Sequence, residues 1–235
     1  MNSLSNQTPQ NLLLATLPTE EYQSLIQQSE DVDLPLHQVI YQPGEVMKYA
    51  YFPNQGMISL VAMTKEDASV EIGLIGKEGM VGLPIILGGN SSISLAVVQV
   101  AGSAIRIEAK QLKAEFDKGG YFQSLLLRYI QARLTQVSQT SVCNRLHRME
   151  ERLARLLLIV HDCLHFLRDS QRIFSCNMIL EHLWSNEDTP GEEAVGAYIK
   201  SLRHKLKEKG ASSNLIETLY GIGYRLGAAV GKSRE

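Results

Sequence analysis

The spacing of hydrophobic and polar residues changes twice along the chain. It predicts a helical start, a β-rich part and a helical remainder. Residues 9–30 have helical spacing. Residues 34–108 contain short β-rich runs separated by glycine-containing turns, including Pro53-Asn54-Gln55-Gly56 and Gly88-Gly89-Asn90. Regular short strands with glycine turns are typical of an antiparallel barrel or sandwich. The turn signals cease after residue 120, so the rest of the chain is predicted to be mainly helical.

One long helix is predicted from Tyr121 to about Asn144. Its apolar residues follow 3-4-3 spacing at Leu127, Ile130, Leu134 and Val137. This spacing forms a narrow seam suited to a partner helix, so we expect two copies of the chain to pair along it as a homodimer. The alternative is that the stripe packs against the β-rich part of its own chain.

Three further helices and a hairpin are predicted after the long helix. The second helix runs from about Met149 to Arg168, and the third follows Ser175, a typical N-cap residue. A fourth helix, from about Glu192 to Lys209, ends before a glycine. Residues 215–227, "LIETLYGIGYRLG", read as two short strands around a glycine turn.

The fourth helix has two stripes of different chemistry. Its apolar stripe, expected to be buried, consists of Val195, Ile199, Leu202 and Leu206. Its second stripe is basic or titratable and consists of Lys200, Arg203, His204 and Lys207. A helix with a positive solvent face can lie along a phosphate backbone. The alternative is an ordinary solvated surface.

The hairpin favours the first interpretation, because a helix in the major groove with a hairpin beside it is a winged helix-turn-helix arrangement. We therefore expect double-stranded DNA as a partner. On the hairpin, Thr218, Tyr220 and Arg225 can reach the DNA backbone, whereas Tyr224 is expected to pack inward. The candidate DNA contacts are Val195, Tyr198, Lys200, Arg203, His204, Lys207, Thr218, Tyr220 and Arg225.

Composition and motifs narrow the class of protein. The 235 residues are 44% hydrophobic and 20% charged, which excludes a disordered chain and allows a sizeable core. No apolar run reaches the roughly 18 residues of a membrane span, so we expect a cytoplasmic protein without a membrane partner. GxSxG, P-loop, HExxH and GxGxxG motifs are all absent. We therefore expect no enzyme activity, no catalytic residue, no metal and no cofactor.

Longer stretches carry a family resemblance. The sequences "YFPNQGMISLV", "VEIGLIGKEGMVGLP", "AVVQVAGSAIRI" and "CNRLHRMEERLARLLL" resemble the Crp/Fnr family of bacterial regulators. This resemblance implies a jelly-roll sensor barrel, a long dimerisation helix and a DNA-binding domain. The stretch "LRDSQRIFSCNMILEHLWSNEDTPGEEAVGAYIKSLRHKLKEKG", followed by "LIETLYGIGYRL", is instead similar to the OmpR/PhoB-type winged helix of response regulators.

The DNA-binding half departs from the OmpR/PhoB pattern in two ways. Its usual N-terminal four-stranded sheet is expected to be missing, so the helix from Met149 would serve as the first helix. Glu193 stands where family members often carry arginine, and Tyr220 stands where the wing often carries arginine. A glutamate near phosphates repels them, which favours weakened DNA binding.

The sensor half also departs from its family. Cyclic-nucleotide-binding members use a Gly-Glu cassette and an Arg-Ser pair, because a cyclic phosphate needs a charge partner and N–H donors. Here no arginine occurs between Lys77 and Arg106. We therefore expect an unknown small-molecule effector rather than cyclic AMP. The candidate effector pocket consists of Gly79, Gly82, Leu83, Ser91 and Ser92.

The sequence thus predicts an α+β protein with an N-terminal antiparallel jelly-roll β-barrel, a long dimerisation helix and a C-terminal winged helix-turn-helix. The expected divisions are a sensor at 1–120, a dimerisation helix at 121–148 and a winged-helix domain at 149–235. The predicted function is a DNA-binding transcription regulator. The alternative is a ligand-binding or protein-interaction module whose DNA-binding domain is vestigial.

Overall fold

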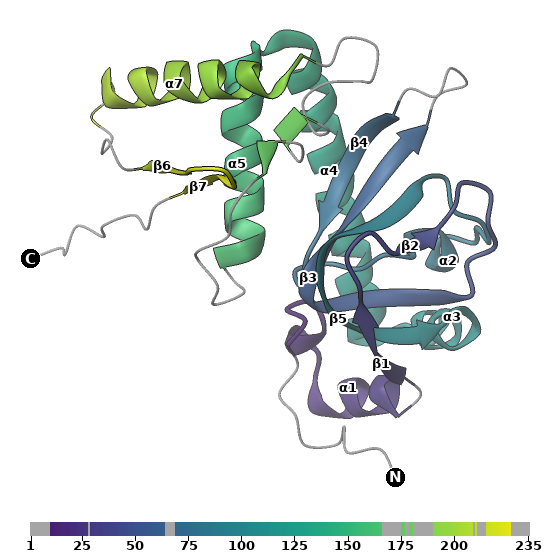
Figure 1. Cartoon of the computed structure of the whole chain (residues 1–235). Coiled ribbons are helices and arrows are strands. Elements are labelled where there is room, and N and C mark those ends of the chain that lie inside the picture. The colour runs from purple at the N-terminus through teal and green to yellow at the C-terminus, as the bar shows by residue number, and fades with distance from the viewer. Residues whose placement is uncertain are drawn as a thin grey trace, which may run out of the picture. The chain divides into compact units, whose positions relative to one another are not determined.

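A computed structural model describes residues 10–27, 29–63, 69–165, 175–176, 179–180, 190–208, 210 and 215–226. The chain divides into two compact units, Met1–Ser141 and Val142–Glu235. Figure 1 shows the strand-rich first unit in purple to teal and the second unit in green to yellow.

The chain enters the first unit through two short helical pieces rather than one long helix. A 3-10 turn at Leu14–Thr16 is followed by α1 (Thr19–Ile26), and strand β1 (Ser29–Leu34) begins soon after. The prediction of a helix over residues 9–30 is therefore wrong beyond Ile26. Ser29 already pairs with Ile107, so sheet pairing overrides the helical spacing there.

A buried amide anchors this N-terminal segment. The side chain of Asn11 is 0% exposed. Its Nδ2 donates to the carbonyl oxygens of Pro53 at 2.8 Å and Gly79 at 3.0 Å, while its Oδ1 accepts from the Leu14 N–H at 3.1 Å. All three contacts satisfy polar groups that would otherwise be buried without partners.

The strands of the first unit form one antiparallel sheet. Its order is β1-β5-β3-β4, with β2 also paired to β5. The remaining strands are β2 (Val39–Tyr41), β3 (Tyr49–Met63), β4 (Ser69–Ile75) and β5 (Leu95–Glu108). The predicted α+β class is confirmed, and the fold of this unit is jelly-roll-like. Within the described residues, however, the sheet is open and does not close into a barrel.

The predicted turn at residues 53–56 is instead a bulged part of one long strand. The pairing of β3 with β5 continues through this stretch with register shifts between Pro53 and Gln55 and between Gln55 and Met57. Gly56 has a φ of 83°, and a Cβ there would lie 2.4 Å from the Val100 carbonyl oxygen. Proline and glycine therefore mark a bulge, where two backbones approach closely, and not a chain reversal.

Helices α2 (Leu83–Ile86), α3 (Ala109–Asp117) and α4 (Gly120–Leu146) complete the first unit, and α4 extends past its boundary. The inner face of α4 buries Phe122, Leu125 and Leu126 in the hydrophobic core. The Tyr129 hydroxyl accepts a hydrogen bond of 3.1 Å from the Met80 N–H. The long helix is thus joined to the loop before α2.

The predicted seam lies mainly on the outer face of α4. Leu127 is 50% exposed, Leu134 is 64% exposed and Val137 is 40% exposed. Ile130 differs, because it packs partly against the core of its own unit. The alternative that the stripe packs against its own chain therefore applies to Ile130, and the other three leave an uncovered apolar stripe.

The described part of the second unit contains α5 (Met149–His165), α7 (Glu192–Glu208), β6 (Ile216–Leu219) and β7 (Gly223–Leu226). β6 and β7 pair as an antiparallel hairpin, as predicted. Of the predicted third helix, Cys176, Ile179 and Leu180 are helical, and the rest lies outside the described residues. Over the described ranges, no helix has the length and apolarity needed to cross a bilayer.

Candidate nucleic-acid interface

The buried face of α7 holds the helix in the second unit. Val195, Ile199 and Leu202 are buried, as the apolar spacing predicts, and α7 contacts α5. Val195 is 0% exposed, so its side chain cannot touch DNA. Its inclusion among the candidate DNA contacts is therefore wrong, because its position in the apolar stripe places it in the core.

The opposite face of α7 is open to solvent. Lys200, His204 and Lys207 are exposed. His204 Nε2 lies 3.3 Å from Glu208 Oε1, one turn further along the same helix. Among the described residues, neither the Lys200 nor the Lys207 side chain makes a hydrogen bond or ion pair. Their ammonium groups are available to a polyanion. Tyr198 is only partly exposed.

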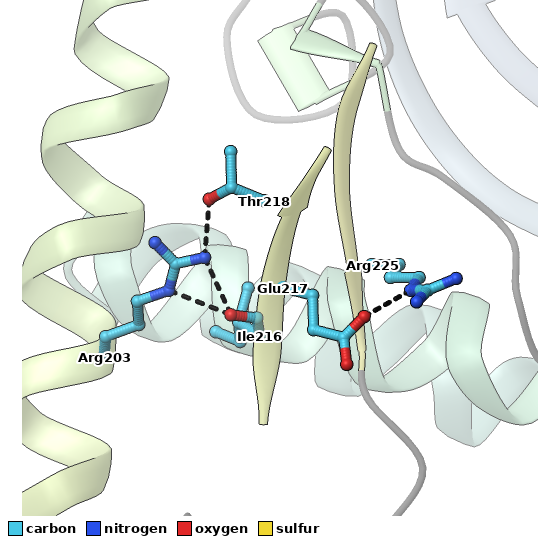
Figure 2. Close-up of polar contacts among 5 residues, drawn as sticks. All are labelled: Arg203, Ile216, Glu217, Thr218 and Arg225. Atoms are coloured by element: carbon cyan, nitrogen blue, oxygen red, sulfur yellow. Dashed lines mark hydrogen bonds and ion pairs between the residues drawn. The ribbon is translucent and has the colours of Figure 1, made fainter. Parts of the chain in front are cut away.

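Arg203 points from α7 to the hairpin, as Figure 2 shows. Its Nε and one terminal nitrogen donate to the Ile216 carbonyl oxygen at 3.0 and 2.7 Å. The same terminal nitrogen donates to Thr218 Oγ1 at 2.7 Å. The guanidinium also lies 6.0 Å from the centre of the Tyr224 ring. Arg203 and Thr218 therefore bind each other and fix the hairpin beside the helix.

Arg225 also has a partner within the hairpin. It sits opposite Glu217 in the strand pairing, and its Nε lies 2.5 Å from Glu217 Oε2 (Figure 2). Tyr220, by contrast, is 93% exposed at the turn between the strands. Ile222, which the sequence analysis did not single out, is also exposed there. The glycines on either side of it in the sequence could have marked it as an exposed residue of the turn.

One lysine of α7, Lys205, pairs with another helix of the same unit instead of facing only solvent. Its Nζ lies 3.5 Å from Glu150 Oε1 on α5, and Ser201 Oγ donates to the same oxygen at 3.3 Å. A hydrogen bond from its own backbone N–H, and after it the charge of Lys205, lower the pKa of Glu150. Lys205 lies outside the basic stripe of Lys200, Arg203, His204 and Lys207.

The candidate effector residues surround α2 and the loops beside it. A Cβ on Gly79 would lie 2.3 Å from the Tyr129 hydroxyl, and Gly82 has a φ of 118° at the start of α2. Both positions therefore favour glycine. Leu83, the first residue of α2, follows Gly82 with a partly buried apolar side chain.

The two serines are held by the loops around them. Ser91 forms a bridge with Val46, and Ser92 is buried. The Ser92 hydroxyl donates to the Ser94 carbonyl oxygen at 2.6 Å, so its proton is already engaged. None of the five effector residues has a charged side chain. Arg106 forms an ion pair with Glu30, and its guanidinium lies 4.3 Å from the centre of the Tyr49 ring.

Two family descriptions match separate parts of the chain. Residues 31–118 match the cyclic nucleotide-binding domain. Residues 161–226 match the C-terminal domain of transcriptional regulatory proteins. The chain combines these two domain families. The expected resemblance to a Crp/Fnr-type sensor joined to a response-regulator-type winged helix is thereby confirmed.

Solved structures of regulators have a fold similar to that of this chain. CLP, a global regulator from Xanthomonas campestris described as responsive to c-di-GMP, is 14% identical with a TM-score of 0.61, covering 89% of this chain and 99% of that one. A Crp/Fnr-family regulator from Eubacterium rectale is 11% identical with a TM-score of 0.62, covering 92% and 94%. At these identities the likeness concerns the fold.

Among curated proteins, RcaC from Microchaete diplosiphon is 42% identical over 74 residues, which is 31% of this chain. The chain spans 11% of the length of RcaC. The domain matches favour a transcription regulator over the alternative of an interaction module with a vestigial DNA-binding domain. The description matched at residues 161–226 is that of transcriptional regulators.

Proposed function

We propose that the chain is a homodimeric transcription regulator that binds double-stranded DNA through α7 and the β6–β7 hairpin. The observation that carries this proposal is the solvent face of α7, where Lys200 and Lys207 have no partner among the described residues. The hairpin tied to this helix by Arg203 supplies the wing. Unpaired cations on an exposed helix face are what a phosphate backbone requires.

The DNA-contacting residues divide by what they touch in the protein. The residues that would contact DNA directly are the exposed ones, Lys200, His204, Lys207 and Tyr220. Tyr198 is only partly exposed and would make a smaller contact. Arg203, Thr218 and Arg225 would act mainly by holding the hairpin in place, since each is hydrogen-bonded within the unit. Their contacts with DNA would then be secondary.

The proposed divisions are a sensor at 1–120, a dimerisation helix at 121–148 and a winged-helix domain at 149–235. The uncovered stripe of Leu127, Leu134 and Val137 supports pairing of two α4 helices. A two-fold dimer would prefer a two-fold DNA site with half-sites about one helical turn apart. The protein would act in the cytoplasm, without catalytic activity and without a membrane partner.

The proposed effector is a small molecule other than cyclic AMP. A cyclic phosphate needs a positive or N–H-rich partner. The candidate pocket offers the apolar Leu83, and the Ser92 hydroxyl donates to a backbone carbonyl. Calorimetric titration of the full chain with cyclic AMP is expected to show no binding.

The proposal is tested by fluorescence anisotropy of the full chain on its own upstream DNA across a range of salt concentrations. We expect log K to fall steeply with log salt. In Lys200→Ala/Lys207→Ala the slope should be shallower by about 2 per subunit, or about 4 for the dimer, because each lost phosphate contact removes about 0.9. Lys205→Ala is the matched control on the same helix. Its lysine faces Glu150, so its slope should stay close to that of the wild type.

The outcomes distinguish a second unit that binds DNA from one that is vestigial. A wild-type protein that binds no DNA at low salt would overturn the proposal and leave the sensor as a ligand-binding or protein-interaction module. Equal slopes for the double variant and Lys205→Ala would place the DNA contact somewhere other than this face of α7.

A further inference from the structure

An exposed stripe of α7 contains an acidic residue as well as basic ones. Glu193, Ala197, Lys200 and His204 follow one another at i, i+4, i+7 and i+11, and all four are exposed. At 3.6 residues per turn they form one line on the side of the helix opposite Val195 and Ile199. A DNA duplex that meets Lys200 and His204 therefore also meets Glu193.

Glu193, like its neighbour Glu192, differs from the acidic residues of α5, the end of α7 and the hairpin. Glu150 is paired with Lys205, Glu208 with His204, and Glu217 with Arg225. Within the described part of the chain, the Glu193 carboxylate makes no hydrogen bond or ion pair. Its neighbour Glu192 is likewise exposed, but it lies on another side of the helix.

The position of Glu193 decides which part of a duplex it can approach. It is the second residue of α7, about 10 Å along the helix axis from Lys200. In helix-turn-helix docking, the N-terminal residues of the recognition helix contact base edges in the major groove. Lys200 and Lys207 lie further along and can reach phosphates. The small side chain of Ala197 leaves the groove side of the helix open between them.

A carboxylate in the major groove needs a hydrogen-bond donor, because it is acceptor-only. Only the amino groups of cytosine and adenine donate there, and guanine and thymine present acceptors that would repel it. Adenine places its N7 acceptor beside its amino group, so it suits an amide better than a carboxylate. Cytosine is the base that an unpaired glutamate fits.

We propose that Glu193 is a specificity-determining residue that accepts a hydrogen bond from the N4 amino group of a cytosine in each half-site. This inference rests on the proposed function and assigns it a sequence preference. A residue that only repels phosphates would weaken binding to all sequences alike. Glu193 instead lowers the affinity for DNA in general and increases the preference for one base pair.

The test is selection of double-stranded DNA from a random library by the full chain, followed by sequencing. The wild type is expected to select a motif with an invariant cytosine in each half-site. Glu193→Gln should lower the preference for that cytosine about ten-fold and shift it to adenine, because an amide pairs with adenine N6 and N7. Glu192→Gln removes the same charge from the same helix turn and should leave the motif unchanged.

Three outcomes would refute the proposed role of Glu193. A wild-type motif that stays the same in Glu193→Gln would refute the role of Glu193 and leave DNA binding standing. A change of equal size in Glu192→Gln would assign the effect to the charge of the helix start rather than to base contact. Selection of no DNA by the wild type would refute the proposed function and this inference together.

Discussion

Helices α4 and α7 both bury one face and expose the other, but their exposed faces have opposite chemistry. The outer stripe of α4 is apolar, with Leu127, Leu134 and Val137 exposed. The outer stripe of α7 is charged, with Glu193, Lys200 and His204 exposed. The inner faces are alike, since both are lined by buried aliphatic residues such as Leu126 and Ile199.

The difference teaches which kind of partner each helix is suited to. An exposed leucine gains about 1.5–3 kcal/mol when it is removed from water, so an apolar stripe favours another apolar surface. A charged stripe loses hydration when buried and gains only where opposite charges or donors meet it. Helical spacing alone does not separate the two cases, and the side chains of the outer face do.

The largest expected effect comes from giving the α4 stripe the chemistry of α7. Leu134→Glu would place two carboxylates at the proposed dimer seam. We expect the dimer dissociation constant to rise about a hundred-fold or more, since an uncompensated buried charge costs about 3–5 kcal/mol. Sedimentation equilibrium of the full chain measures this directly.

Ala132→Glu is the matched control, because Ala132 is exposed on another side of α4. It should leave the dimer intact. If Leu134→Glu and Ala132→Glu have the same association state as the wild type, the stripe is not the dimer seam.

A smaller effect separates the cations of α7 that hold the fold from those that face solvent. Arg203→Ala leaves the Ile216 carbonyl and the Thr218 hydroxyl without their charged donor. We expect a local loss of about 2 kcal/mol, which corresponds to roughly 30-fold faster amide exchange over residues 215–226. Lys200→Ala should change this exchange by less than about two-fold, because exposed lysines contribute little to stability.

Hydrogen exchange measured by mass spectrometry checks both variants. Equal protection of the hairpin in Arg203→Ala and Lys200→Ala would mean that the Arg203 hydrogen bonds do not hold the wing.

The smallest expected effect is on the pH dependence of the free energy of unfolding, through the ion pair of Lys205 and Glu150. The pKa of Glu150 is lowered in the folded state, so the unfolded chain binds more protons as the pH falls. The stabilising contribution is therefore present above the usual glutamate pKa, about 4.3, and is lost as the pH falls through the lowered folded value. We expect it to be about 0.3–0.5 kcal/mol, because the Lys205 side chain is half exposed.

Urea unfolding of the wild type, Lys205→Ala and Lys207→Ala at pH 7 and pH 3 measures this contribution. Part of the pH dependence should disappear in Lys205→Ala and remain in Lys207→Ala. The ion pair is without consequence if both variants keep the full pH dependence.

The elements with regular spacing were predictable from the sequence. The long helix was expected from Tyr121 to about Asn144 and runs over Gly120–Leu146. The fourth helix begins at Glu192 as expected, and the hairpin falls within residues 215–227. Amphipathic spacing and turn glycines are local signals, and in these segments the tertiary contacts agree with them.

The placement of Val195 in the core could have been read from its apolar stripe, but other features that the spacing did not reveal depend on contacts between distant residues. The stretch around Gly56 has the composition of a turn, but pairing with β5 keeps it in a strand. Arg203 belongs to a basic stripe, and only the position of the Ile216 carbonyl shows that it ties the helix to the hairpin. Ile130 belongs to the seam by spacing, but it packs partly on its own core. No local pattern contains this information.

The Asn11 amide has a consequence for the order of folding. Its two carbonyl partners, Pro53 and Gly79, are 42 and 68 positions away in the chain. Closing loops of this length is entropically costly, and the two carbonyls come together only when β3 and the loop after β4 have already met. Asn11 therefore completes its hydrogen bonds only after these strands have met, and its segment seals a unit whose strands have assembled without it.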